Sequence, residues 1–527
     1  MDRNQKKFQV GLWASRMSFG TLISRLLGFV RDMLIATFFS RTQTDIFFVA
    51  FRFPNFFRRF LGEGSFSASV TPSLTKSLQE KGKDFTKDLS SALFTILFCG
   101  TSFLTVLGCL FMPEMMEFLF KNTSYSLVEG KLDQTIQVGR IVFVYLFFVS
   151  SYSYFMSVAQ VFGRFFLPAL APALFNAALI LFILSPSTWW SFPALSLAWA
   201  VVVGGMIQVA LILYIMSSID FWPRFLWNFK TKEFKSTLSQ FAPAAIGLSG
   251  LSLIGLVNLY FAGWLEEGTH TYIYYGDRLL ELPRSLIAIS IGTALVPELS
   301  RLKTLNQVPD FVKTTSHYLN FLLFLVLPSA LVFCLIPEPI IRVLFQRGEF
   351  DLESVLKTAL ILKIYSVVLI FSSIARIFSS CFFAIQKNWE LTIANGLYVF
   401  FHALSAWGLT YFYGFTGLIW STALSSIFYV CVLLFLMSRY FGKIHRFFGG
   451  YFLLKLLPGL LLLAACIFCY EYIYNFGLHF LSHGWSQFLS LFFVLSLGSC
   501  FYIGSSLLLK EPIVYELKYL LKRKHAS

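Results

Sequence analysis

The segment LAWAVVVGGMIQVALILYIMS (residues 197–217) contains 21 residues and no charged side chain. A helix of about 20 apolar residues crosses the hydrocarbon core of a bilayer. The whole chain has a similar character, because 57% of its 527 residues are hydrophobic and only 13% are charged. Soluble domains carry roughly 25% charged residues. The sequence therefore predicts an all-α polytopic membrane protein.

Comparable apolar segments recur along the chain. They predict fourteen transmembrane helices, near residues 13–39, 44–73, 89–112, 135–161, 168–185, 193–217, 238–263, 271–300, 314–336, 353–384, 389–411, 414–438, 449–475 and 485–509. The basic N-terminus is not followed by a small-residue cleavage site, so we expect the first span to be retained rather than removed as part of a signal peptide.

Lysine and arginine are distributed unevenly between the connections. With a cytoplasmic N-terminus, 24 of them fall in predicted cytoplasmic segments. The opposite side holds five: Arg41, Lys121, Lys131, Arg342 and Arg347. Cytoplasmic connections are enriched in basic residues, so both termini are predicted to be cytoplasmic. The formal net charge of +15 follows from this asymmetry, and we expect no nucleic-acid partner.

The opening segment has a second copy, LIWSTALSSIFYVCVLLFLMS (418–438), at a constant offset of 221 residues. A looser pair joins residues 44–74 to 271–299. Together they predict that spans 1–6 and 7–12 are repeats related by an axis along the membrane normal, with a substrate site between the halves. The predicted parts are an N-terminal lobe at 1–218, a C-terminal lobe at 219–440, and residues 441–527 with the last two spans and a basic tail.

Thirteen of the 42 basic residues fall inside the predicted spans, where each charge is costly. In the first span, Arg25 and Asp32 are seven residues apart and share a helical face, whereas Arg31 lies about 120° away, toward a neighbouring helix. The second and eighth spans hold corresponding clusters: Asp45, Arg52, Arg58, Arg59 and Glu63, and Asp277, Arg278, Glu281 and Arg284. Pro54 and Asn55 predict a break in the second span.

Arginine dominates the middle of these three spans, and its planar, permanently charged fork suits phosphate. The pattern predicts a watery cavity that binds an anionic ligand, such as a phosphate or diphosphate. A purely structural alternative is that acids such as Asp32 and Asp277 neutralise neighbouring arginines within the bundle.

Five segments stand out: SRLLGFVRD (24–32), PNFFRRFLGEG (54–64), YYGDRLLELP (274–283), IGTALVPELS (291–300) and FQRGEFD (345–351). They resemble the signature segments of the MurJ (MviN) family, the lipid II flippases of the multidrug/oligosaccharidyl-lipid/polysaccharide exporter superfamily. The resemblance covers the whole chain. It implies alternating access of two six-helix lobes around a central cationic cavity, plus two extra C-terminal helices that guide a lipid tail.

For function, the resemblance implies transport of lipid II, the undecaprenyl-diphosphate-linked disaccharide-pentapeptide, across the bacterial cytoplasmic (inner) membrane during peptidoglycan and cell-wall biogenesis, which sets cell shape. The implied partners are lipid II, membrane lipids and the cell-wall synthesis machinery, with the chain itself a monomer. The implied substrate-binding residues are Arg25, Arg31, Arg58 and Arg278. The supporting residues are Asp32, Asp45, Arg59, Glu63, Asp277 and Glu281.

We expect neither an enzyme nor a cofactor, because the sequence shows no nucleophile–base pair, metal-ligand set or phosphate-binding loop. A coupling ion or the membrane potential would drive transport, and the sequence does not identify which. Four alternatives remain: a flippase for another polyprenyl-diphosphate-linked sugar, a cation or drug exporter of the same superfamily, a membrane scaffold, and an enzyme that acts on the lipid. The arginine-rich spans argue against the exporter, whose cavity would be lined by acids and aromatics.

Overall fold

The computed structural model describes residues 3–61, 65–219, 221–442, 450–479, 482–509 and 511. Within these, the description excludes the side chains of residues 3–19, 59–61, 65–68, 240, 242–251, 450–451 and 483. The described residues form helices and no strand. The predicted all-α class is therefore confirmed.

The chain divides into two compact units that are interleaved in sequence. The first unit comprises Met1–Thr271 and Arg347–Phe350, and the second comprises Tyr272–Gln346 and Asp351–Ser527. The chain consequently passes between the units three times. The lobe boundaries predicted after residues 218 and 440 follow the internal repeat rather than these contacts, and they remain predictions.

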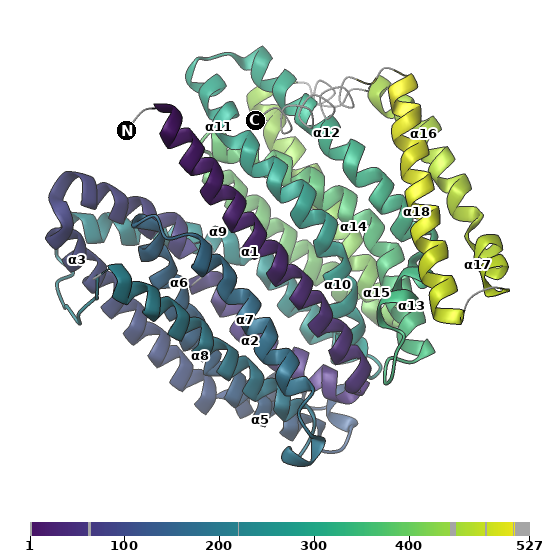
Figure 1. Cartoon of the computed structure of the whole chain (residues 1–527), viewed down its shortest axis with the longest axis horizontal. Coiled ribbons are helices and arrows are strands. Elements are labelled where there is room, and N and C mark those ends of the chain that lie inside the picture. The colour runs from purple at the N-terminus through teal and green to yellow at the C-terminus, as the bar shows by residue number, and fades with distance from the viewer. Residues whose placement is uncertain are drawn as a thin grey trace. The chain divides into compact units, whose positions relative to one another are not determined.

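The first unit consists of helices that precede residue 263 (Figure 1). They are α1 (Arg3–Phe38), α2 (Arg41–Leu61), α3 (Ser65–Leu110), α4 (Met112–Phe120), η1 (Ser124–Leu127), α5 (Lys131–Phe143), α6 (Tyr145–Val161), α7 (Phe166–Ile183), η2 (Ser187–Trp189), α8 (Ala194–Ile219) and α9 (Lys232–Ala262). Helix α1 packs against α7, and α9 packs against α2 and α3.

The second unit contains the remaining helices (Figure 1). They are α10 (Thr269–Pro283), η3 (Arg284–Ile289), α11 (Ser290–Thr304), α12 (Val308–Leu335), α13 (Pro337–Phe345), α14 (Leu352–Ala384), α15 (Asn388–Phe441), α16 (Gly450–Phe468), α17 (Tyr470–Leu478) and α18 (His483–Leu508). The first three residues of α10 belong to the first unit. Helix α14 packs against α11, α12 and α15, and α16 packs against α18.

Helix α8 contains the uncharged segment 197–217, and two adjacent glycines explain how it packs. A methyl group at Gly204 would lie 2.7 Å from the Phe175 ring, and one at Gly205 would lie 2.8 Å from the Tyr145 ring. Small residues let membrane helices approach closely, which favours dispersion contacts between them. Helix α8 accordingly packs against both α6 and α7.

Ten helices in the described part of the chain are long and apolar enough to span a membrane. The multi-pass membrane class is therefore confirmed, while the count of fourteen stays a prediction. One of the ten candidates, Asn388–Phe441, contains two predicted spans, 389–411 and 414–438. They meet at Gly414, whose φ of 54° and ψ of −131° interrupt the helical backbone.

Residues 76–87, which connect two predicted spans, lie within α3, which is helical on both sides of a turn at Gly82, where φ is 81°. The predicted break at Pro54 was wrong, since α2 continues to Leu61. A proline removes a single hydrogen bond from the ladder, and membrane helices tolerate it when neighbours satisfy the freed backbone group.

Side chains on both sides of the turn in α3 contact the start of α9. Lys81 forms an ion pair with Glu233, and Thr237 lies within hydrogen-bond distance of Ser73. The hydrogen bond from Lys81 holds the pKa of the Glu233 carboxyl below its usual range. This contact is exposed, so it orders the turn more than it stabilises the fold.

We expect Gly414→Ala to lower the free energy of unfolding by about 1–3 kcal/mol, because an L-residue at this φ and ψ is strained. Gly408→Ala is the matched control, since a methyl group at either position meets no atom within 4 Å. The control substitution should be neutral or stabilise the helix by up to about 1 kcal/mol. Unfolding of both variants in detergent would measure the difference, and equal stabilities would contradict the backbone argument.

Candidate functional site

The charged residues of α1 form a network with α7. Nε and Nη2 of Arg31 donate to Oδ1 of Asp32 at 2.9 and 2.6 Å, and Nη1 donates to Oδ1 of Asn176 at 2.9 Å. Asn176 in turn donates to the backbone oxygen of Ser24 at 2.9 Å. Arg31 thus points toward a neighbouring helix, as its position on α1 predicts. The buried carboxylate of Asp32 neutralises it, as the structural alternative requires.

Two further predicted arginines, Arg25 and Arg58, are partly buried. Nε of Arg58 donates to Oδ1 of Asn55, one helical turn earlier on α2, at 3.1 Å. The side chain of Arg59 and the whole of Glu63 lie outside the described residues. Arg52, also on α2, donates to the backbone oxygen of Gly255 on α9 at 3.2 Å.

Asp45 lies in a fully buried ion cluster at the start of α2. Oδ2 accepts from Nζ of Lys131 at 2.9 Å and from the backbone N–H of Gly268 at 2.8 Å. Oδ1 accepts from the backbone N–H and the hydroxyl of Thr271 at 3.0 and 2.7 Å. Four donors from two other parts of the chain therefore hold one carboxylate, which joins α2 to α5 and to the start of α10.

Aromatic side chains surround this ion cluster. Nζ of Lys131 lies 4.4 Å from the centroid of the Tyr125 ring, and the ring of His270 packs edge-on against Tyr125 and Phe120. The Lys131 side chain is only 1% exposed, although its sequence neighbourhood predicts a residue in an outer connection. Its partner is 86 positions away, so no local pattern could have identified it.

In the second unit, the predicted residues Asp277, Arg278 and Glu281 lie on α10, and Arg284 begins the next turn. Glu281 forms an ion pair with Arg284. That turn, η3, is π-helical, a distortion that occurs frequently at functional sites. The structure therefore brings Glu281 and Arg284 together, as their spacing on one helix predicts.

Four residues of α14 and α15 that were not predicted as site residues face this region. Arg376 interacts electrostatically with Arg284 and with Tyr429. The Tyr429 hydroxyl donates to Oδ1 of Asn395 at 2.6 Å, and its ring stacks on Tyr398 at a centroid distance of 4.6 Å. The sequence did contain a signal for Arg376, which is an arginine in an apolar span with no acidic residue within a helical turn.

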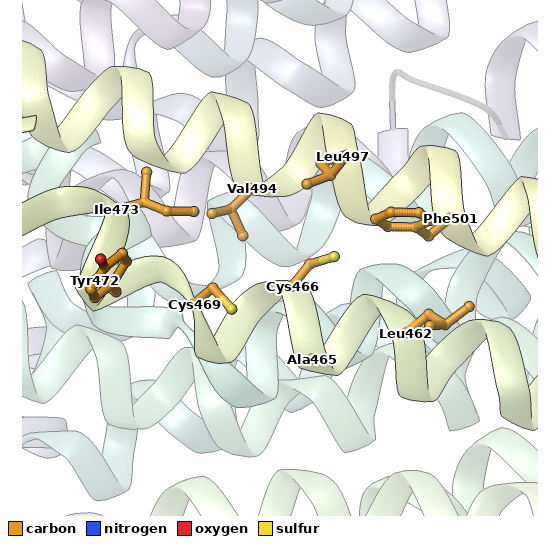
Figure 2. A pocket seen from close by; sticks show the side chains of 9 residues that line it. All are labelled: Leu462, Ala465, Cys466, Cys469, Tyr472, Ile473, Val494, Leu497 and Phe501. Carbon is orange, nitrogen blue, oxygen red and sulfur yellow. The ribbon is translucent and has the colours of Figure 1, made fainter. Parts of the chain in front are cut away.

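A cavity of about 440 Å³ lies between α16, α17 and α18. Its lining is almost entirely apolar: Leu462, Ala465, Cys466, Cys469, Tyr472, Ile473, Val494, Leu497 and Phe501. Figure 2 shows Val494 and Leu497 of α18 on the side facing Cys466 of α16. This is the region where the family resemblance predicts a groove for a lipid tail.

Among the described residues, no group of three or more His, Cys, Asp or Glu side chains could hold a metal ion. Each unit instead supplies arginines within helices of apolar composition. Guanidinium groups in such surroundings can bind oxyanions through charge-assisted hydrogen bonds. The anionic ligand that these arginines indicate in the sequence stays a prediction.

Comparison with solved structures identifies the fold. The structure of a lipid II flippase MurJ in an inward closed conformation has a TM-score of 0.74 at 22% identity and covers 94% of this chain and 99% of that one. An inward-facing MATE family multidrug transporter of the MOP superfamily has a TM-score of 0.66 at 14% identity, covering 82% and 98%. The chain therefore shares the fold of these two proteins.

Sequence comparison narrows the class to a family. Residues 34–495 match the family described as "Lipid II flippase MurJ". A "Probable lipid II flippase MurJ" of Bdellovibrio bacteriovorus is 36% identical over 425 residues, covering 80% of this chain and 81% of the relative. The "Lipid II flippase MurJ" of Burkholderia cenocepacia is 31% identical over 405 residues, covering 74% and 78%. The chain belongs to the MurJ family of lipid II flippases.

Proposed function

We propose that this chain moves lipid II from the cytoplasmic to the outer leaflet of the bacterial cytoplasmic membrane by alternating access. The observation that carries the proposal is the family match over residues 34–495. The arginines within apolar helices support it independently, because the diphosphate of an undecaprenyl-linked precursor is the kind of group that guanidinium forks bind.

The proposed transport cycle assigns different tasks to different residues. Arg25, Arg31, Arg58 and Arg278 bind the diphosphate, and Arg59 adds positive charge beside them. Asp32, Glu63, Asp277 and Glu281 balance the charge of the arginines, and Asp45 supports the site by joining α2 to Lys131. The apolar cavity between α16 and α18 receives part of the undecaprenyl chain, whose burial is favourable at about 0.8 kcal/mol per CH₂. No bond is made or broken, so the chain acts as a transporter and not as an enzyme.

The proposal also includes orientation and partners. Both termini face the cytoplasm, as the asymmetry of basic residues favours. The chain works as a monomer beside the cell-wall synthesis machinery that consumes lipid II. Its driving force is a coupling ion or the membrane potential. One elementary charge that moves across the whole membrane potential gains about 2.3 kcal/mol per 100 mV.

Depletion with complementation tests this function directly. In bacteria that lose their own lipid II flippase, we expect expression of this chain to restore growth, cell shape and the amount of lipid II accessible outside the membrane. An empty vector and a MATE-family transporter of the same superfamily serve as controls. If the chain accumulates in the membrane at normal levels and accessible lipid II does not recover, the proposed function is wrong.

A further inference from the structure

Arg376 is a partly buried charge within α14. It forms no ion pair with any described residue. Its Nε is buried and has no hydrogen-bond partner in the described part of the chain. A charged group in a membrane helix is costly unless it is paired or faces a polar cavity. Buried polar atoms are almost always hydrogen-bonded, so this guanidinium lacks a partner that it is expected to have.

The stem of Arg376 is held in place by α11. A methyl group at Gly292 would lie 3.0 Å from Cγ and 3.1 Å from Nε of Arg376, so a larger residue at this position would have to displace the arginine side chain. One turn further along α14, the hydroxyl of Ser380 donates to the backbone oxygen of Gly292 at 2.9 Å. The hydrogen bond joins α14 to α11, and the close packing against Gly292 restricts the stem of Arg376, which is a form of the preorganisation that favours binding.

Arg284 supplies a second positive charge to the same region. It begins the π-helical turn η3, which packs against α14, the helix that carries Arg376. Glu281 neutralises Arg284 only in part, because the two side chains of this ion pair are 38% and 40% exposed. Two like charges near each other raise the energy of the empty site, and an anion between them would remove that repulsion.

Polar groups of α15, which packs against α14, lie on one side of the region. The stacked rings of Tyr398 and Tyr429 and the hydrogen bond from Tyr429 to Asn395 keep this wall rigid. The single hydroxyl hydrogen of Tyr429 is used in its bond to Asn395, so the Tyr398 hydroxyl is the group on this wall that can donate to an oxyanion.

We propose that Arg284 and Arg376 form an oxyanion-binding site within the second unit, which takes a phosphate or a carboxylate of the transported head group. This site is additional to Arg25, Arg31, Arg58 and Arg278. Only the identity of the ligand rests on the proposed function, because lipid II carries both a diphosphate and peptide carboxylates. The site itself follows from the uncompensated guanidinium and its charged neighbour.

Binding to the purified full-length protein in detergent tests the proposal. One probe is undecaprenyl diphosphate, which carries phosphates alone, and the other is N-acetylmuramoyl pentapeptide, which carries carboxylates alone. The variants are Arg376→Gln, Arg376→Lys and Arg284→Gln. Arg342→Gln is the matched control, because Arg342 is paired with Glu338 on α13. Affinity and the unfolding temperature of the ligand-free protein are both measured.

We expect Arg376→Gln and Arg284→Gln to lower the affinity for one of the two probes by about tenfold to a hundredfold. We also expect the ligand-free unfolding temperature to stay level or rise, because one of two repelling charges is gone. Loss of undecaprenyl diphosphate binding identifies the phosphate as the ligand, and loss of the muropeptide identifies the carboxylate. Arg376→Lys should retain part of the affinity, because it keeps the charge but loses the fork.

Unchanged affinity of Arg284→Gln for both probes would overturn the inference, even if Arg376→Gln failed to fold. So would a fall in ligand-free stability without any change in affinity, because that is the behaviour of a structural arginine. The result is separable from complementation. If the chain restores lipid II export but its binding of the probes does not depend on Arg284 and Arg376, only this site is refuted. If binding depends on these arginines but the chain does not restore export, only the proposed function is refuted.

Discussion

Lys131→Met is expected to lower the free energy of unfolding by about 3–5 kcal/mol. The substitution keeps an apolar stem of similar length but removes the ammonium group that donates to Asp45 at 2.9 Å. The carboxylate would then stay buried at 1% exposure without its countercharge. Its remaining donors, Gly268 and Thr271, are neutral groups and cannot balance a full negative charge. Unfolding by SDS titration, followed by loss of helical signal, measures the effect.

Lys121→Met is the matched control for this measurement. Lys121 lies in the same predicted outer region, but its side chain is 70% exposed and its nearest partner, Glu117, is 4.0 Å away. Its substitution should change stability by less than about 0.5 kcal/mol. The double variant Asp45→Asn/Lys131→Met should regain much of the lost stability, because no isolated charge remains. If Lys131→Met and Lys121→Met unfold alike, the buried pair does not stabilise this part of the protein.

Replacing Arg58 or Arg278 by alanine should reduce lipid II transport by about tenfold to a hundredfold and abolish complementation. Each arginine contributes a charge-assisted contact worth about 1.5–3 kcal/mol if it binds the diphosphate. Lysine at either position should rescue transport in part, since it keeps the charge but cannot bind in a bidentate manner. Transport of a fluorescent lipid II by proteoliposomes and growth after depletion of the native flippase are the measurements.

Each arginine has a control in its own unit. Arg140 donates to the backbone oxygen of Cys109 in the first unit, and Arg342 pairs with Glu338 in the second. Alanine at either of these positions should leave transport close to normal. Membrane levels of all four variants must be compared first, because a structural arginine would reveal itself by loss of protein. Normal levels of Arg58→Ala and Arg278→Ala together with full transport would refute a cationic site at these positions.

The fold class followed from composition, whereas the local geometry of several turns did not. A run without charges such as residues 197–217 has few alternatives to a membrane helix, and the turn at Gly414 falls between two predicted spans as expected. The turn at Gly82 was missed, because the polar residues around it resemble a loop when they are in fact helical. Polarity marks where a helix leaves the apolar part of its surroundings and not where the helix ends.

The contacts of the candidate site were also predictable only in part. Charged residues within one helix, such as Glu281 and Arg284, pair as their spacing predicts, because helical geometry determines which side chains are neighbours. Partners from different helices were not predictable, since Arg31 and Asn176 are 145 positions apart. A single sequence contains no information about which apolar helices pack together. The roles assigned to Arg25, Arg31, Arg58 and Arg278 therefore remain predictions that mutagenesis must test.

The short segment Arg347–Phe350 has a mechanical consequence. The backbone N–H of Glu349 donates to the oxygen of Thr37 at 3.1 Å, and a methyl group at Gly348 would lie 2.1 Å from that oxygen. Four residues are thus fastened to the end of α1, although the helices on both sides of them belong to the other unit. The two units are consequently linked by three passages of the backbone instead of one. Any rocking of one against the other has to be absorbed by bond rotations at all three passages together.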